Sequence, residues 1–236
     1  APVAVRNGLV GGTWLPTTYQ GGVNFYIGNN PLADGTYRPI VPGKQTPTLE
    51  RQEPARVAEQ ELGRKLNPGE VSSFWLHRAL RWAREHPLDF ARLQLRKLGR
   101  FFDWYEQPDA VDYYWVRGSS PVYRLPLIEF STLSVLAVAG LWLSRRELRR
   151  FAPCLLFAVG WTATTVAFFL FSRYRLPLVP SILPLAAIPL ASAWETWRAR
   201  SRHWVYGAFG IAVAFALTLV PYAPRMDLVH YNLARL

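Results

Sequence analysis

Four long apolar segments occupy the second half of the chain, separated by short polar links. They cover residues 125–143, 151–171, 176–194 and 204–220. Each is close to the roughly 20 residues that an α-helix needs to cross a hydrocarbon core about 30 Å thick. A soluble protein has little use for four such segments in succession, although buried helices of a large soluble core are the alternative. The pattern predicts four transmembrane helices.

The third apolar segment is interrupted by proline. Its prolines are Pro177, Pro180, Pro184 and Pro189. Each removes a backbone donor and disfavours the helical conformation of the preceding residue. In lipid such a helix persists only where neighbouring protein or water satisfies the freed carbonyl groups. We therefore expect a kinked or broken helix that lies against protein or a cavity.

The first half of the chain is polar and lacks long apolar segments. Residues 1–48 are rich in Gly, Pro, Asn, Thr and Tyr, so we expect an irregular region with a few short strands. Val23–Ile27 is the candidate strand, because glycine and asparagine turn signals flank it. Beyond residue 48, start and stop signals predict helices over 53–66, 72–85 and 87–104. Ser72 or Ser73 is the expected N-cap of the second of these helices.

The helix expected over 87–104 is amphipathic and basic. Its apolar stripe consists of Ala91, Leu95, Leu98 and Phe102, and its basic stripe of Arg92, Arg96 and Arg100. A basic, aromatic-rich helix next to a membrane span is typical of helices that lie in the membrane interface. A helix that packs on the polar region, with a solvated arginine face, fits the same pattern. Both interpretations remain open at this stage.

The arginines between the apolar segments set the expected orientation. The net charge of +11 and a pI near 10.2 would suggest nucleic-acid binding in a soluble domain. Most arginines after residue 125, however, lie in two links, which hold Arg145, Arg146, Arg149 and Arg150, and Arg198, Arg200 and Arg202. By the positive-inside rule both links face the cytoplasm. The polar first half, the 172–175 link and the C-terminal tail then face the other side, and we expect no nucleic-acid partner.

Thiol and metal chemistry finds no support in the sequence. Cys154 is the only cysteine and lies inside an apolar segment, which excludes a disulfide framework. The four histidines show no metal-ligand spacing, so we expect neither a metal nor a cofactor. The chain opens at Ala1 without a signal-peptide pattern. We expect it to be a fragment or a processed chain.

These patterns predict a mostly α integral membrane protein. Residues 1–48 form an irregular or short-strand region, and 49–124 form a helical region with a membrane-surface amphipathic helix, both non-cytoplasmic. Residues 125–222 contain the four transmembrane helices. Residues 223–236 form a short non-cytoplasmic tail.

Three passages carry a family resemblance. They are Gly21–Pro31 (GGVNFYIGNNP), the stretch from Ser73 through His86-Pro87 to Glu106, and Arg173–Pro177 (RYRLP). In this order they resemble the C-terminal portion of bacterial glycosyltransferase family 39 proteins, members of the GT-C superfamily. That group includes protein O-mannosyltransferase-like enzymes and the aminoarabinose transferases that modify lipid A.

The resemblance implies a multi-pass enzyme of the bacterial inner (plasma) membrane. Such enzymes transfer a sugar from a polyprenyl-phosphate donor to a periplasmic or other extracytoplasmic acceptor. The implied partners are the lipid-linked sugar, membrane lipids and the N-terminal remainder of the same polypeptide. The family's catalytic carboxylate, a general base, lies in that remainder. We therefore expect no catalytic residue in this chain.

Two groups of side chains are candidates for substrate contacts. The donor phosphate is expected at Arg173, Arg175, Tyr174 and Lys97, because the arginine fork matches phosphate oxygens. The sugar or acceptor is expected along Asn24, Asn29, Asn30 and Glu106. Anchoring at lipid headgroups is the alternative role for the arginines, and turn formation for the asparagines.

A non-enzymatic membrane protein is the alternative function. A transporter or a polysaccharide-export subunit would use a proline-broken helix at its binding site. A scaffold that holds partners at the membrane is a further alternative.

Overall fold

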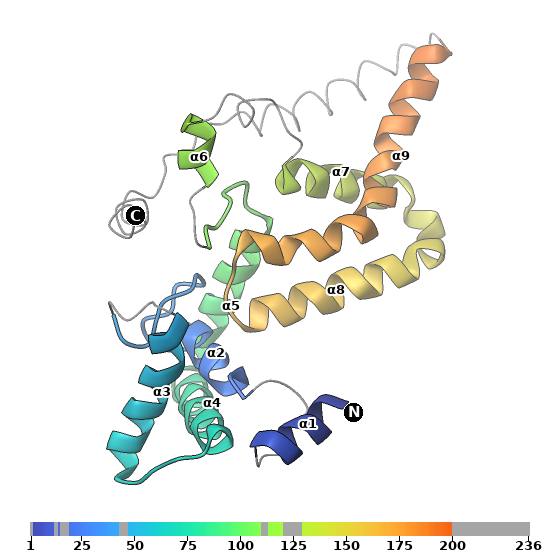
Figure 1. Ribbon diagram of the computed structural model, residues 1–236. Helices are drawn as coiled ribbons and strands as arrows, with labels where there is room; N and C mark the ends of the chain where they lie inside the picture. The colour runs from blue at the N-terminus through green and yellow to red at the C-terminus, as the bar shows by residue number, and fades with distance from the viewer. Residues whose placement is uncertain are drawn as a thin grey trace. The chain divides into compact units, whose positions relative to one another are not determined.

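The computed structural model describes residues 2–11, 14, 19–42, 47–109, 113–119 and 129–199, and these are mostly helical (Figure 1). The chain divides into two compact units. Unit 1 contains Ala1–Leu98 and Thr165–Leu170, and unit 2 contains Gly99–Thr164 and Phe171–Leu236. The boundary between them falls inside the helix over 87–102, and the segment Thr165–Leu170, which includes the end of the helix over 152–167, belongs to unit 1.

Unit 1 is built from the helices that precede the apolar segments. These are α1 (Pro2–Gly11), α2 (Gly21–Gly28), α3 (Pro47–Leu62), α4 (Pro68–Glu85) and the first three turns of α5 (Pro87–Phe102). The three helices predicted between residues 53 and 104 are therefore confirmed as α3, α4 and α5. The first two begin earlier than predicted.

The strand predicted at Val23–Ile27 is wrong, because these residues lie in α2. Val23 and Ile27 are one helical turn apart and both are buried. The flanking glycine serves close packing instead of a turn: a Cβ at Gly22 would lie 1.8 Å from the carbonyl oxygen of Ser72. The described residues contain no strand, only an isolated parallel bridge between Thr36 and Leu170.

The N-cap predicted for α4 at Ser72 or Ser73 is also wrong. The helix begins at Pro68, and Asn67 caps it in a reciprocal capping box with Glu70. The Glu70 N–H donates to Asn67 Oδ1, and the Asn67 N–H donates to Glu70 Oε2, both at 2.9 Å. Asn before Pro is a helix start signal here. The Ser72 hydroxyl instead accepts the Gly22 N–H at 3.0 Å.

The core of unit 1 centres on Trp75. Its ring lies 4.6 Å from that of Tyr26 in α2, centroid to centroid. Its indole N–H donates to the Pro54 carbonyl of α3 at 3.1 Å. Ala58 and Ala79 are fully buried, which brings α3 and α4 close together. Trp75 of α4 therefore contacts both α2 and α3.

In α5 the predicted apolar stripe is exposed. Leu95, Leu98 and Phe102 are open to the surroundings, whereas Leu93, Lys97 and Phe101 are buried. The helix therefore packs through a face that the stripe does not include. The exposed stripe lies beside the exposed Arg92 and Arg96.

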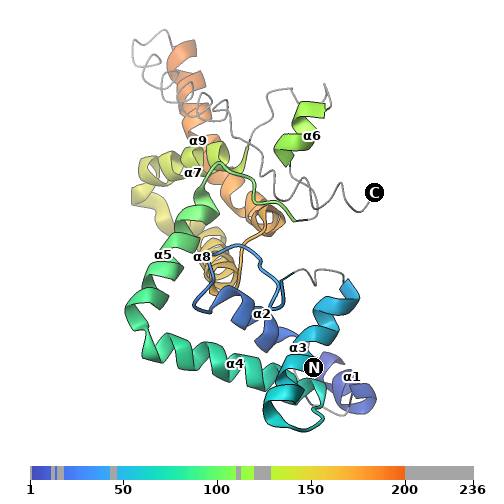
Figure 2. The same ribbon diagram turned by 90° about the vertical axis from the view of Figure 1, so that its left-hand side faces the viewer.

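Unit 2 contains the helices of the second half of the chain, the apolar ones among them. They are α6 (Tyr113–Ser119), α7 (Phe130–Leu143), the 3₁₀ helix η2 (Arg145–Phe151), α8 (Ala152–Ala167, which ends in unit 1), the 3₁₀ helix η3 (Ser172–Leu178) and α9 (Val179–Arg198). Figures 1 and 2 show α7 beside α9. Leu136 and Ala137 of α7 form a buried cluster with Leu185 and Ala186 of α9.

Two helical stretches are long and apolar enough to cross a membrane. They are Arg145–Ala167 and Ser172–Arg198, and this statement rests on length and composition alone. Phe130–Leu143 is apolar but shorter. The predicted span at 204–220 and the start of the span at 125–143 lie outside the described residues. Much of the apolar surface of α8 and α9 is exposed, for example at Leu156, Val159, Leu183 and Trp194.

The proline-rich segment forms η3 followed by a bent α9 (Figures 1 and 2). Pro184 and Pro189 lie inside α9, where each removes one backbone hydrogen bond and crowds the preceding turn. The predicted kink is confirmed. The bent region lies against α7, because Leu185 belongs to the buried cluster of these two helices.

Candidate functional site

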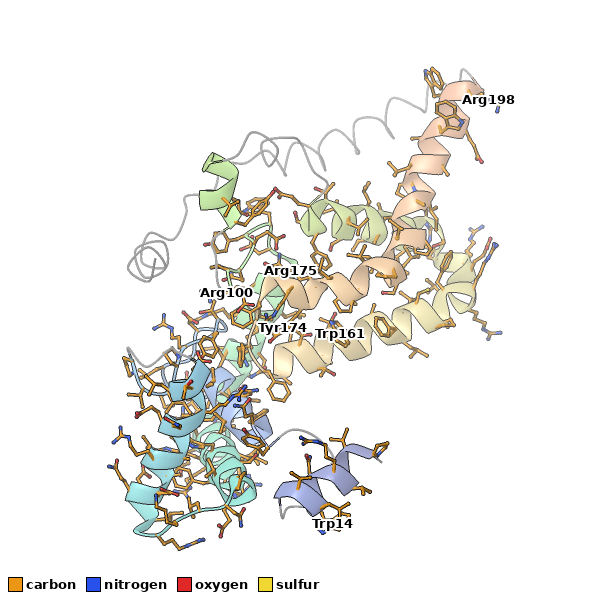
Figure 3. The ribbon with its side chains drawn as sticks, viewed as in Figure 1. Trp14, Arg100, Trp161, Tyr174, Arg175 and Arg198 are labelled. Carbon is orange, nitrogen blue, oxygen red and sulfur yellow. The ribbon has the colours of Figure 1, made fainter. Side chains whose placement is uncertain are left out.

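Arg175 is the most buried arginine among the described residues and lies in η3 of unit 2. Its side chain is 3% exposed. Nη2 donates to the carbonyl oxygens of Arg100 at 2.6 Å and Tyr105 at 3.1 Å. Nη1 lies 3.4 Å from Glu106 Oε1. Figure 3 shows Arg175 beside Arg100.

These contacts make Arg175 an internal clamp. Its guanidinium also lies over the ring of Phe130, 5.5 Å from the centroid. Two carbonyls, one carboxylate and one aromatic face together satisfy a cation that would be costly to bury alone. Removal of one partner of a buried charge typically costs about 3–5 kcal/mol. The residue predicted to bind phosphate therefore holds the end of α5 and the following loop to η3.

Arg173 is the more accessible arginine of the pair. Its side chain is 56% exposed and forms an ion pair with Asp109. Its guanidinium lies 5.1 Å from the ring centroid of Phe171 and 5.3 Å from that of Tyr174. The Tyr174 carbonyl accepts the indole N–H of Trp161 at 2.7 Å (Figure 3). The backbone of this turn is thus fixed, while the Arg173 head group remains within reach of solutes.

A pocket of about 520 Å³ opens where α5 ends and α7 begins. Its polar lining comes from Arg100, Asp103, Ser131 and Thr132, and its apolar lining includes Phe102 and Trp104. The ring of Phe130 packs edge-on against Phe101 at 5.9 Å, which joins α7 to the end of α5. The size lies within the usual range for small-molecule sites.

Ser131 is the unusual member of this lining. It is 7% exposed, and its hydroxyl has no hydrogen-bond partner among the described residues. A buried hydroxyl left unpaired costs about 1–3 kcal/mol. The oxygen itself is inaccessible to solvent, so it does not face the pocket.

Lys97 and Asn29, predicted for different parts of the substrate, meet in a buried network of unit 1. Lys97 is 0% exposed, and its Nζ donates to Asn29 Oδ1 at 3.0 Å. The same oxygen accepts Gln94 Nε2 at 2.8 Å. Asn29 Nδ2 donates to the carbonyls of Phe25 and Ala167, both at 2.8 Å.

Burial governs the charge of Lys97. Removal from water lowers the pKa of its ammonium from 10.5 to about 7. As folded, the network is closed to solvent and Lys97 does not present its charge at a surface. Its role in the described structure is to support the junction of α2, α5 and the segment around Ala167.

The other predicted residues fall into local roles. Asn30 Nδ2 donates to the carbonyls of Tyr26 and Ile27, and its Oδ1 accepts the Leu32 N–H, so it terminates α2. Asn24 is half-buried within α2. Glu106 joins Arg175 in unit 2. The predicted asparagines lie in unit 1 and the predicted arginines in unit 2.

Sequence reasoning missed Asp103, Trp104, Asp109 and Ser131. The hydroxyls of Ser131 and Thr132 inside an apolar segment were the available signal, because apolar spans bury unpaired polar groups only at a cost.

No group of three His, Cys, Asp or Glu among the described residues is placed to hold a metal ion.

Comparison with protein-family models, curated proteins and solved structures found no match to this chain. The resemblance to glycosyltransferase family 39 therefore rests on the three sequence passages alone.

Proposed function

We propose that this chain is the C-terminal part of a multi-pass membrane glycosyltransferase. The enzyme moves a sugar from a polyprenyl-phosphate donor to an extracytoplasmic acceptor. Four transmembrane helices hold the chain in the bacterial inner membrane, with the first half on the periplasmic side. The acceptor hydroxyl attacks the anomeric carbon, the bond from that carbon to the phosphate oxygen breaks, and a carboxylate outside this chain takes the proton.

The position of Arg173 carries the proposal. It is half-exposed at the start of Ser172–Arg198, an apolar stretch long enough to cross a membrane. A lipid-linked donor places its phosphate at such a boundary, since its polyprenyl chain stays in the hydrocarbon region. Arg173 is suited to stabilise the negative charge that develops on the leaving phosphate. Arg175 fixes the turn that carries Arg173, because its guanidinium donates to the carbonyls of Arg100 and Tyr105.

The exposed apolar surfaces support the membrane part of the proposal. Large side chains of α8 and α9 remain exposed, and soluble monomers rarely expose apolar patches of that extent. Their contact with lipid would remove them from water. The exposed leucines of α5, bordered by arginines, fit a helix in the plane of the membrane interface.

The test uses the full-length protein with a radiolabelled polyprenyl-phosphate sugar and its acceptor. Arg173→Gln should lower the transfer rate at least about tenfold, because it removes charge stabilisation worth more than 1.4 kcal/mol. Arg173→Lys should retain part of the rate. Arg146→Gln, an exposed arginine in η2, is the matched control and should transfer normally. Equal activity of Arg173→Gln and Arg146→Gln would refute the phosphate role.

A transporter or polysaccharide-export subunit is the second candidate, favoured by the bend of α9 at Pro184 and Pro189. Reconstituted full-length protein distinguishes the two. Movement of a lipid-linked saccharide across the bilayer without transfer to an acceptor would support this alternative and exclude the transferase.

A further inference from the structure

The charge of Arg173 is already paired in the structure. Its guanidinium forms an ion pair with the carboxylate of Asp109, which lies in the loop after α5. A guanidinium presents its N–H donors in one fork, and a carboxylate in front of the fork takes the donors that a phosphate would use. A phosphate that binds Arg173 must therefore displace Asp109.

The backbone places Asp109 beside Arg173. The N–H of Ser172, the residue before Arg173, donates to the carbonyl of Gln107 at 3.1 Å. This hydrogen bond joins the loop after α5 to the first residue of η3. It involves neither charged side chain, so we expect it to persist when the ion pair opens.

Arg173 has contacts that hold it in place without Asp109. Its guanidinium lies over the rings of Phe171 and Tyr174, 5.1 and 5.3 Å from their centroids. The indole N–H of Trp161 fixes the Tyr174 carbonyl at 2.7 Å. Two aromatic faces and a fixed backbone thus keep the guanidinium at this position. The carboxylate contributes chiefly by neutralising the arginine.

The ion pair is exposed enough to be exchanged. The side chain of Arg173 is 56% exposed and that of Asp109 is 38% exposed. Pairs of this kind are weak, because water and dissolved ions screen them. A phosphate ester carries negative charge and has oxygens that fit the same fork, so it is able to take the place of the carboxylate. The released carboxylate then turns to water.

We propose that Asp109 acts as a latch on Arg173. Its carboxylate occupies the arginine while no donor is bound, and the phosphate of the lipid-linked donor displaces it. The inference rests on the proposed function, since it adds a competitor for the same arginine. The exchange moves no proton and breaks no covalent bond. Removal of the carboxylate should therefore strengthen binding of the donor phosphate.

The experiment measures equilibrium binding of radiolabelled polyprenyl phosphate, without a sugar, to the full-length protein in detergent. Asp109→Asn should bind this probe about two- to fivefold more tightly than the wild type, the range expected for loss of an exposed ion pair. Asp89→Asn is the matched control, because Asp89 forms an exposed ion pair with Arg92 on α5. It should bind like the wild type.

Two further variants identify the cause of any gain. In an Arg173→Gln background no arginine remains to be released, so Asp109→Asn should no longer strengthen binding. Asp109→Glu retains a carboxylate and should bind like the wild type. An equal gain with and without Arg173 would mean that Asp109 merely repels the phosphate.

Unchanged or weaker binding by Asp109→Asn overturns the inference, and so does an equal gain in the Arg173→Gln background. Either result leaves the proposed function standing if Arg173→Gln itself still lowers sugar transfer. Latch-controlled binding in a full-length protein that transfers no sugar would refute the transferase and keep the latch. Absence of binding by both the wild type and Asp109→Asn would refute the phosphate role of Arg173 and the latch with it.

Discussion

Two arginines two positions apart have different environments in this protein. Arg173 and Arg175 are equivalent in a sequence pattern, and both fit a phosphate site. The 3₁₀ turn of η3 directs one into a network of carbonyls and leaves the other half-exposed. The sequence identifies the type of side chain at each position, whereas its accessibility depends on the short helix that carries it.

Lys97 gives a prediction at the same scale. Burial lowers its pKa to about 7, whereas the unfolded chain keeps the usual value of 10.5. Between these values the unfolded state binds more protons, so the free energy of unfolding rises with pH across the window. Below about pH 7 the burial penalty is fully present. Lys97→Met should therefore stabilise the protein near pH 7, by on the order of 2 kcal/mol.

Thermal unfolding near pH 7 and near pH 10 checks this expectation. The advantage of Lys97→Met should shrink at the higher pH, and Asn29 Oδ1 keeps Gln94 as a donor in the variant. Lys65→Met, at an exposed lysine, should show no such pH dependence. A destabilised Lys97→Met at both pH values would mean that the ammonium contributes more as a hydrogen-bond donor than its burial costs.

At the scale of elements, glycine sets how closely α7 and α9 pack. A Cβ at Gly140 would lie 1.8 Å from the Leu185 carbonyl oxygen and 3.3 Å from Pro189 Cδ. Gly140→Ala should therefore force the helices apart and cost about 1–3 kcal/mol. Gly160→Ala on α8 is the matched control, because its Cβ would meet nothing within 4 Å. That variant should be neutral or slightly stabilising.

The melting temperatures of the two variants in detergent decide this point. A loss confined to Gly140→Ala supports close packing of α7 on α9. Equal melting temperatures for both variants would show that the two helices do not pack as described.

The elements that the sequence predicts well are those with periodic apolar positions or clear breakers. The helices α3 to α5 follow from start and stop signals, and the bend of α9 follows from proline. The strand prediction at Val23–Ile27 is wrong because short apolar runs fit either a strand or a helix. Gly22 resembles a turn signal in the sequence, but it allows close packing against Ser72. The N-cap at Asn67 is missed because Asn-Pro-Gly is read as the end of the preceding helix, whereas it is also the start of α4.

The candidate site is less predictable than the helices. Ser131 and Asp103 are 28 positions apart in the sequence and line one pocket only because Phe101 and Phe102 pack on Phe130. Lys97 reaches Asn29 through a helix face opposite to the apolar stripe. Such contacts depend on tertiary packing, which periodicity within one helix does not encode.

At the scale of the whole molecule, the number of membrane crossings determines on which side of the membrane each part of the chain lies. Two stretches are long enough to cross, and α7 is shorter. With four spans, α7 crosses and η2 lies on the opposite side from unit 1. If only α8 and α9 crossed, as a hairpin, residues 1–98 would lie on the same side as η2, and the hydrogen bond from Asn29 to the Ala167 carbonyl at the other end of α8 could not form. The arginines Arg145, Arg146, Arg149 and Arg150 of η2 favour a cytoplasmic position.

Cysteine labelling separates these topologies, with Cys154, the one cysteine of this chain, and any further cysteines of the full-length protein replaced by serine. In a Cys154→Ser background, Lys65→Cys and Arg146→Cys place thiols at two exposed positions. With four spans, a membrane-impermeant maleimide added to spheroplasts should label Lys65→Cys alone, and Arg146→Cys should react only after the membrane is permeabilised. Labelling of both positions from outside would leave α8 and α9 as a two-helix hairpin and would contradict the contact of Asn29 with the Ala167 carbonyl. Arg173 would then lie on the cytoplasmic side, where a periplasmic donor phosphate does not reach it, and the proposed transferase would lose its phosphate contact.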